Sequence, residues 1–324
     1  MRTVKLYIFH CIMLVVLTVF AFRTGGLDYV AYYLEFLEPE KHAVSNEIGY
    51  RFLIISLHGV FGFWFVLLLA NLLFYFSHRK FIKHFIFFDK AFVFFVYFIY
   101  LSLFLILGSP RRLIAYSFVF VVLYTVFYTN RISFKTYVYP FLASLFHVSA
   151  IIIVPVVIFF RYNLKSYFKA RTLLHLIFLF SFIAFFLYQF GIVDYILLKI
   201  QYYQVYALKE QEYLNDVPSV YSGFLKRMVV VLLFYFSIRK WVKGKAIIKL
   251  CVMEVSLYFF LGLISPVLSV VATYLSPVYI FPFICPEYNS SSFFKRCSLV
   301  LGAVVYYLPT IVGLIKLFGD VYVG

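Results

Sequence analysis

Apolar residues fill long stretches of this chain, and short polar segments separate them. Most of the stretches are about twenty residues long, which is the length that crosses the hydrocarbon of a bilayer as a helix. The pattern predicts an all-α, polytopic transmembrane bundle of about 10–11 spans, formed by residues 1–324 as a single integral membrane domain. The stretches run roughly over 4–22, 52–76, 91–107, 112–128, 134–160, 172–190, 219–238, 246–264, 266–284 and 298–317.

Basic residues between the stretches predict how the chain is oriented. Lys and Arg collect on cytoplasmic segments, so we expect the N-terminus to be cytoplasmic. A single crossing by 134–160 would place the two later basic loops outside. We therefore expect this stretch to enter the membrane and return, as a broken pair of helices, Phe134–His147 and Val148–Phe160. The basic segments are the N-terminus and the loops 77–90, 161–171 and 239–249.

Acidic residues follow the opposite pattern. Nine of the 13 acidic residues lie in two long polar segments, 23–51 and 191–218. The predicted orientation places both segments outside the cytoplasm. We therefore expect any chemistry to take place on the extracytoplasmic face.

Composition agrees with a membrane protein and changes how the charge is interpreted. The chain is 65% hydrophobic, with a mean hydropathy of +0.98, more apolar side chain than a soluble domain can bury. A net charge of +16 would suggest nucleic acid in a soluble protein. Here we assign it to cytoplasmic loops beside anionic membrane lipids, and we expect no nucleic-acid partner.

An arginine pair at the mouth of one span carries the first candidate chemistry. Arg111 and Arg112 follow Gly108-Ser109-Pro110, and Ser109 is suited to cap the helix that begins there. One interpretation is a helix end that reaches to lipid headgroups. The other is an anion clamp, because arginine donors match phosphate oxygens and a helix N-terminus attracts anions.

A histidine lies where the predicted broken pair bends. His147 is set in an apolar run with Ser144 and Ser149 nearby. Such a histidine is often a packing residue. At a helix break it could also serve as a proton acceptor or an anion ligand.

The first polar segment predicts a short amphipathic helix. Asp28 can cap it, and Tyr29, Tyr32, Tyr33 and Phe36 lie along it. These rings fit an interfacial aromatic belt. They also fit a sugar platform, in which aromatic faces stack on sugar rings and carboxylates bind hydroxyls.

Glu47 and Tyr50 lead directly into the second span, so we expect Glu47 at the mouth of a cavity. Glu38 and Glu40 form an acid-x-acid pattern that is too weak to predict a metal site. Walker, GxSxG and HExxH motifs are absent, and so is a regular acidic or histidine relay through the spans. These absences argue against an ATPase, a metalloprotease and a simple proton pump. We expect no metal and no cofactor.

Lys226 and Arg227 follow Ser219, which could start a helix that runs to Ser237. They would then lie about 11 Å inside the helix start. Two interpretations remain, and the first is slightly favoured. Either the helix starts later and both residues are interfacial, or they face the same cavity as the arginine pair.

Several short motifs together resemble the EpsG branch of the Wzy-type polysaccharide polymerases. These are bacterial plasma-membrane (inner-membrane) proteins of O-antigen, capsule and exopolysaccharide synthesis. The resemblance covers residues 20–160. The motifs that carry it are Asp28-Tyr29 with Tyr32 and Tyr33, Glu47-x-Gly49-Tyr50, Arg111-Arg112-Leu-Ile-Ala115, and Ala143–Ala150 (with His147) followed by Pro155.

The resemblance implies a GT-C-like glycosyltransferase architecture and a glycosyl transfer outside the cytoplasm. A growing glycan on undecaprenyl diphosphate would be moved onto a hydroxyl of a new lipid-linked repeat unit. A flippase and a chain-length regulator would be its partners. Arg111 and Arg112 would stabilise the diphosphate leaving group, and His147, Glu47 or Asp28 would accept the proton. The residues expected to bind substrate are Asp28, Tyr29, Tyr32, Tyr50, Ser149, Lys226 and Arg227.

The chain departs from the family pattern at two places. Ile48 stands where the family commonly has proline, and Val271–Phe283 has no basic residue, so Lys226 or Arg227 would have to supply a second clamp. The competing classes are a lipid-linked oligosaccharide flippase or transporter, a membrane O-acyltransferase and a structural subunit. Basic residues inside the spans are few and cluster toward the outer side, which favours an enzyme working at one face.

Overall fold

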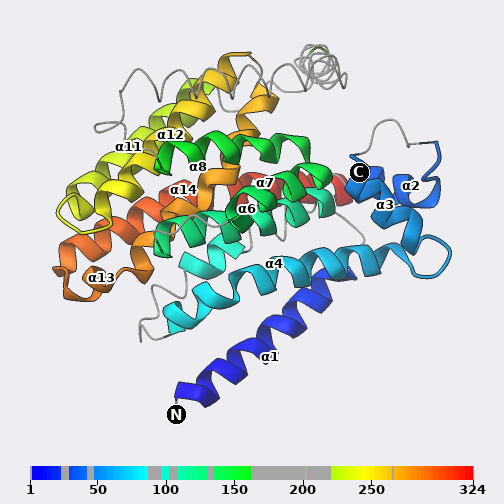
Figure 1. Cartoon of the computed structure of the whole chain (residues 1–324), viewed down its shortest axis with the longest axis horizontal. Coiled ribbons are helices and arrows are strands. Elements are labelled where there is room, and N and C mark those ends of the chain that lie inside the picture. The colour runs from blue at the N-terminus through cyan, green and yellow to red at the C-terminus, as the bar shows by residue number, and fades with distance from the viewer. Residues whose placement is uncertain are drawn as a thin grey trace.

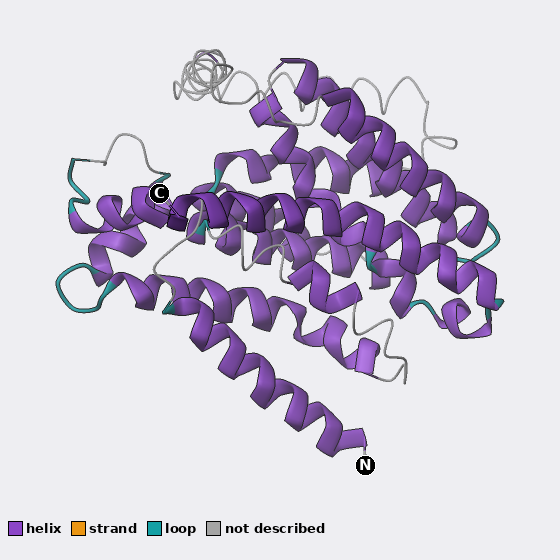
Figure 2. Ribbon diagram, turned by 180° about the vertical axis from the view of Figure 1, so that it is seen from behind, coloured by secondary structure: helices purple, strands orange, loops and turns teal. Residues whose placement is uncertain are grey.

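The structure is a computed structural model. It describes residues 2–22, 29–41, 47–86, 96–101, 109–129, 134–161, 201, 220–264 and 266–323. These residues are helical with short connections and contain no strand, so the predicted all-α fold is confirmed (Figure 2). Three expected segments fall outside the described residues in whole or in large part. They are the span 172–190, the span 91–107 apart from 96–101, and the loop 191–218 apart from residue 201.

The helices follow the chain in this order. Their bounds are α1 Arg2–Ala21, α2 Tyr29–Leu37, α3 Ile48–Leu57, α4 Phe63–Ile86, α6 Pro110–Thr129, α7 Phe134–Phe146, η1 Val148–Ile152, α8 Ile153–Arg161, α11 Val220–Ile238, α12 Gly244–Ile264, η2 Pro266–Tyr279, η3 Phe281–Ile284, α13 Pro286–Ser290 and α14 Phe293–Val323.

Long helices run side by side along the longest axis of the molecule (Figure 1). Among the described residues, α4, α6, α11 and α12 are long and apolar enough to cross a membrane. On α11, Val229, Leu232 and Phe236 are exposed, as expected of side chains that face lipid. The chain thus has the architecture of a multi-pass membrane protein.

Helix α6 lies at the centre of the bundle. Most of its side chains are buried, and its aromatic rings pack against α4, η2 and η3. Phe120, for example, stacks on His78 of α4 and meets the edge of Phe281 of η3. Because α6 is held from several sides, its first turn is a fixed platform.

The short helices α2 and α3 gather at one end of the bundle, together with the C-terminus, and the N-terminus lies at the other end (Figures 1 and 2). The expected single span 52–76 is wrong, because α3 ends at Leu57 and α4 begins at Phe63. The intervening turn contains Gly59 at φ +81°, a conformation that favours glycine. Helix α4 also continues to Ile86, through the first part of the loop expected at 77–90, because Phe81 and Ile82 are buried in the core.

The break predicted within 134–160 is confirmed. Helix α7 ends at Phe146, and His147 has an extended backbone (φ −154°, ψ 108°) before η1 and α8. The chain then returns along α6. Val156 and Val157 of α8 lie with Leu123 and Phe127, toward the opposite end of α6 from the arginine pair. His147 therefore lies at a reversal of the chain, near the end that carries α3.

Candidate functional site

Four chain segments converge at the end of the bundle that carries α2 and α3. They are α2, the start of α3, the first turn of α6 and the bend after α7. Gly49 lets α3 approach α7 closely, since a Cβ atom there would lie 2.9 Å from the backbone oxygen of Leu145. This contact brings the start of α3 beside the bend at His147.

Arg111 is held by groups from α2 and α3. Its Nη1 donates to Oε2 of Glu47 at 3.0 Å, and its Nε donates to the hydroxyl of Tyr32 at 2.8 Å. The two ion-pair side chains are 19% and 10% exposed. Glu47 occupies the N-cap position of α3 but makes no side-chain cap there. Its carboxylate is thus committed to fixing the orientation of Arg111.

Ser109 joins the same cluster and starts α6. Its hydroxyl is hydrogen bonded to the Tyr32 hydroxyl at 2.7 Å and accepts from the backbone N–H of Arg112 at 3.4 Å. The predicted cap is therefore present, and Pro110 follows at the first helical position, where proline is favoured. Tyr50 is fully buried and meets the Tyr32 ring edge-on at 5.8 Å between centroids.

Arg112 occupies a different environment from Arg111. Its side chain is half-buried, and its Nε is buried without a hydrogen-bond partner among the described residues. Arg112 lies one helical turn before Tyr116 on the same face of α6, and the Tyr116 ring stacks on Tyr274 of η2 at 6.0 Å between centroids, so Arg112 lies near Tyr274. The pair thus divides into one arginine held by a carboxylate and one with a donor still available.

His147 and Ser149 are also close to Tyr274. The Ser149 hydroxyl and His147 Nδ1 are 2.5 Å apart and hydrogen bonded. The rings of His147 and Tyr274 have centroids 6.0 Å apart. Tyr274 is therefore a neighbour of the histidine.

A chain of hydrogen-bonded hydroxyl groups lies next to Tyr274. The Tyr274 ring stacks on the Tyr116 ring, and the Tyr116 hydroxyl is 3.0 Å from that of Ser276. The Tyr100 hydroxyl donates to Tyr116 at 3.2 Å and is bonded to Nε2 of His78 at 2.8 Å. These bonds tie α4, α6 and η2 together, and so they hold Tyr274 in place.

Of the remaining residues expected in the site, one is not among the described residues and the others lie elsewhere. Asp28 is outside the described residues. Tyr29 stacks on Tyr33 and meets the edge of Phe63, so its ring packs on the start of α4. Lys226 is half-buried on α11.

Arg227 belongs to a second buried cluster. Helix α11 begins at Val220, so the favoured interpretation that it starts after Arg227 is wrong. Arg227 Nε donates to Oε1 of Glu254 at 2.9 Å, and its guanidinium lies 3.5 Å from the ring centroid of Tyr258. Tyr279 and Tyr306 each donate to Glu254 at 2.8 Å. Arg227 is thus committed to Glu254.

Sequence reasoning missed Glu254 and Tyr274. Glu254 carried a clear signal, since an acid inside an apolar stretch such as 246–264 marks a buried partner. Tyr274 carried little, because it is one of 30 tyrosines and its neighbours come from distant parts of the chain. No group of three or more potential metal ligands gathers within the described residues.

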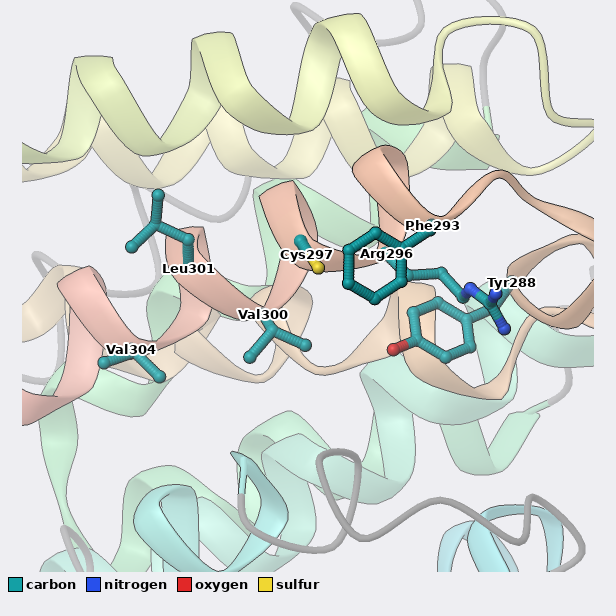
Figure 3. Close-up of a pocket in the computed structure, with 7 residues that line it drawn as sticks. All are labelled: Tyr288, Phe293, Arg296, Cys297, Val300, Leu301 and Val304. Atoms are coloured by element: carbon teal, nitrogen blue, oxygen red, sulfur yellow. The ribbon is translucent and has the colours of Figure 1, made fainter.

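A groove of about 400 Å³ lies away from these residues, along α13 and the start of α14 (Figure 3). It is lined mainly by apolar side chains, with Arg296 beside Tyr288 at one end. None of the residues of the site described above lines it.

Comparison with known proteins gives one result. The model of the EpsG family matches residues 5–319, which extends the resemblance seen over 20–160 to nearly the whole chain. No curated protein and no solved structure matches the chain.

Proposed function

The chain belongs to the EpsG family, and from this premise we propose that it is a membrane glycosyltransferase that polymerises lipid-linked oligosaccharide repeat units. The family suggests a polysaccharide polymerase-type function. The proposal adds the donor, a glycan on undecaprenyl diphosphate, and the acceptor, a sugar hydroxyl of a second lipid-linked unit. The product would be O-antigen, capsule or exopolysaccharide.

The observation that carries the proposal is the gathering of Arg111, Arg112, Glu47 and His147 at one end of the bundle. The departing group is a lipid diphosphate, whose negative charge grows as the glycosidic bond breaks. Fixed cationic donors that await this charge stabilise the transition state without reorganisation. The Glu47 carboxylate supports the proposal because it holds Arg111 in one orientation.

The reaction assigns one role to each group. The acceptor hydroxyl oxygen attacks the anomeric carbon of the donor glycan, and the bond between that carbon and the diphosphate oxygen breaks. His147 accepts the hydroxyl proton, and Arg111 and Arg112 neutralise the diphosphate. We assign the proton to His147 because Glu47 already holds Arg111. Tyr32 and Tyr50 are buried against each other, and Tyr32 contacts Arg111, so we assign them to holding Arg111 and not to stacking on a sugar.

His147→Ala is expected to lower polymer synthesis about 100-fold or more, because general-base catalysis contributes on that scale. The measurement is polymer formed per amount of protein in isolated membranes. His58→Ala is the matched control, since His58 is exposed in the turn between α3 and α4. Equal activity in the two variants would remove His147 from the mechanism.

Gly49→Ala is expected to reduce polymer synthesis between about 10-fold and 100-fold, because small displacements of catalytic groups are costly. The added Cβ would press on the Leu145 backbone and push Glu47 away from Arg111. Gly302→Ala is the control, since its Cβ would lie 2.8 Å from the Phe234 ring, away from the site. If the two variants lost activity equally, general destabilisation would explain both.

The proposal places the protein in the bacterial plasma membrane with its N-terminus in the cytoplasm. The end with α2 and α3 lies opposite the N-terminus and would then face outward, where the repeat units arrive. A flippase would supply those units, and a chain-length regulator would act on the product.

Analysis of lipid-linked glycans in cells that lack the protein tests the function. We expect a single repeat unit to accumulate on the outer leaflet, because flipping continues while polymerisation stops. A unit trapped on the inner leaflet would identify a flippase. Unchanged polymer would point to a decorating enzyme, such as an O-acyltransferase, or to a structural subunit.

A further inference from the structure

Two buried hydrogen-bond donors, the Tyr274 hydroxyl and Arg112 Nε, lie in one region and have no hydrogen-bond partner among the described residues. Tyr274 is 2% exposed, and its hydroxyl makes no hydrogen bond of good geometry within the described residues, although Ser149 lies beside it. The Nε of Arg112 is also buried and unpaired there. Buried polar groups without partners are rare and costly in native proteins, so two in one place indicate an acceptor that arrives with a ligand.

Two neighbouring acceptors of the protein already take part in other hydrogen bonds. Oε2 of Glu47 accepts from Arg111 at 3.0 Å, and the Ser149 hydroxyl is bonded to His147 at 2.5 Å. Glu35 also interacts electrostatically with Arg111. The acidic side chains of α2 and α3 therefore neutralise the charge of Arg111. These contacts leave the charge of Arg112, near Tyr274, without a carboxylate partner among the described residues.

Tyr274 is held firmly enough to act as a binding group. Its ring stacks on Tyr116 at 6.0 Å between centroids, with 25° between the planes. Ser276, two residues further along η2, is bonded to the Tyr116 hydroxyl. The Tyr274 hydroxyl is therefore held in position before a ligand binds, which lowers the entropy lost on binding.

We propose that Arg112 and Tyr274 form a diphosphate subsite, in which Arg112 Nε and the Tyr274 hydroxyl donate to oxygens of one phosphate group. A phosphate oxygen accepts several hydrogen bonds and carries the charge that Arg112 requires. Tyr274 thereby becomes a substrate-binding residue on η2. The proposal deepens the function proposed above and rests on it for the identity of the lipid.

Binding to the purified full-length protein in nanodiscs tests this subsite. The probes are farnesyl diphosphate and inorganic pyrophosphate, with farnesol to measure binding of the tail without phosphate. Tyr274→Phe removes one oxygen and is expected to weaken diphosphate binding about 10-fold, the usual effect of losing a hydrogen bond to a charged group. Farnesol binding is expected to stay unchanged.

Two further variants make the test specific. Arg112→Lys keeps the charge but loses Nε and the planar fork, so it is expected to weaken diphosphate binding at least as much. Tyr288→Phe is the control, because Tyr288 is also 2% exposed and lines the groove on α13 and α14. The thermal unfolding of each variant, measured in the same nanodiscs, identifies any loss caused by misfolding.

The outcomes separate the subsite from the proposed function. Equal affinity of the wild type and a folded Tyr274→Phe variant would overturn the subsite, as would a wild type that binds neither diphosphate probe. If Tyr274→Phe binds both diphosphate probes more weakly than the wild type, the subsite recognises the diphosphate itself. If it binds only farnesyl diphosphate more weakly, the subsite recognises the headgroup of a lipid. Binding that depends on Tyr274, in a protein whose loss leaves polymer unchanged, would keep the subsite and reject the polymerase.

Discussion

Cells that carry Arg111→Ala or Arg112→Ala are expected to make no detectable polymer, although the protein remains in the membrane. Loss of one charge-stabilising donor lowers a rate about 100-fold to 1,000-fold. Arg111→Ala also leaves Glu47 without its ion pair at 3.0 Å, which adds an unpaired carboxylate to the site. Polymer length on a gel and the amount of protein in isolated membranes are the measurements.

Substitution by lysine separates the roles of the two arginines. Lysine keeps the charge but presents a single ammonium group in place of a planar fork. Arg111→Lys cannot reproduce both bonds, to Glu47 and to Tyr32, so activity is expected to fall between that of the wild type and the alanine variant. Arg239→Ala, at an exposed arginine after α11, is the control. Polymer of normal length in both alanine variants would reject this site.

Glu254→Ala is expected to destabilise the folded protein by about 3–5 kcal/mol, the cost of removing one partner of a buried ion pair. Arg227 is almost fully buried and would lose its carboxylate, and the hydroxyls of Tyr279 and Tyr306 would lose their acceptor. The measurement is the unfolding transition of the purified protein in a mild detergent. A change below about 1 kcal/mol would show that the cluster contributes little to stability.

A matched acid and a double variant complete this test. Glu287→Ala removes a half-buried carboxylate that accepts from the backbone N–H of Val242, and it is expected to cost about 1 kcal/mol. Replacing Arg227 with Met and Glu254 with Leu together is expected to recover much of the lost stability, because neither charge then remains buried without its partner.

The sequence predicted those features that depend on the local order of residues along the chain. Basic loops alternate with apolar stretches, and this alternation required a reversal near His147, which the structure contains. Ser109 and Pro110 predicted the start of α6 in the same way. Both inferences used signals that are local in sequence.

Features that depend on distant contacts could not be read from the sequence. The ion pair of Arg111 and Glu47 joins residues 64 positions apart, so the two were expected near one site but not bonded to each other. The division between α3 and α4 was missed because the turn at Gly59 interrupts a stretch that is apolar on both sides. The role of Tyr274 depends on the packing of η2 against α6, which joins residues far apart in the sequence.

The way α2 meets the bundle has a consequence for how such proteins diverge. Tyr32 is its polar tie to Arg111 and Ser109, whereas Val30, Leu34 and Leu37 on the same helix are exposed. On the function proposed above, these exposed positions could change with the sugar while the tie to Arg111 persists. The same arginine site would then serve different polysaccharides through changes in a nine-residue helix.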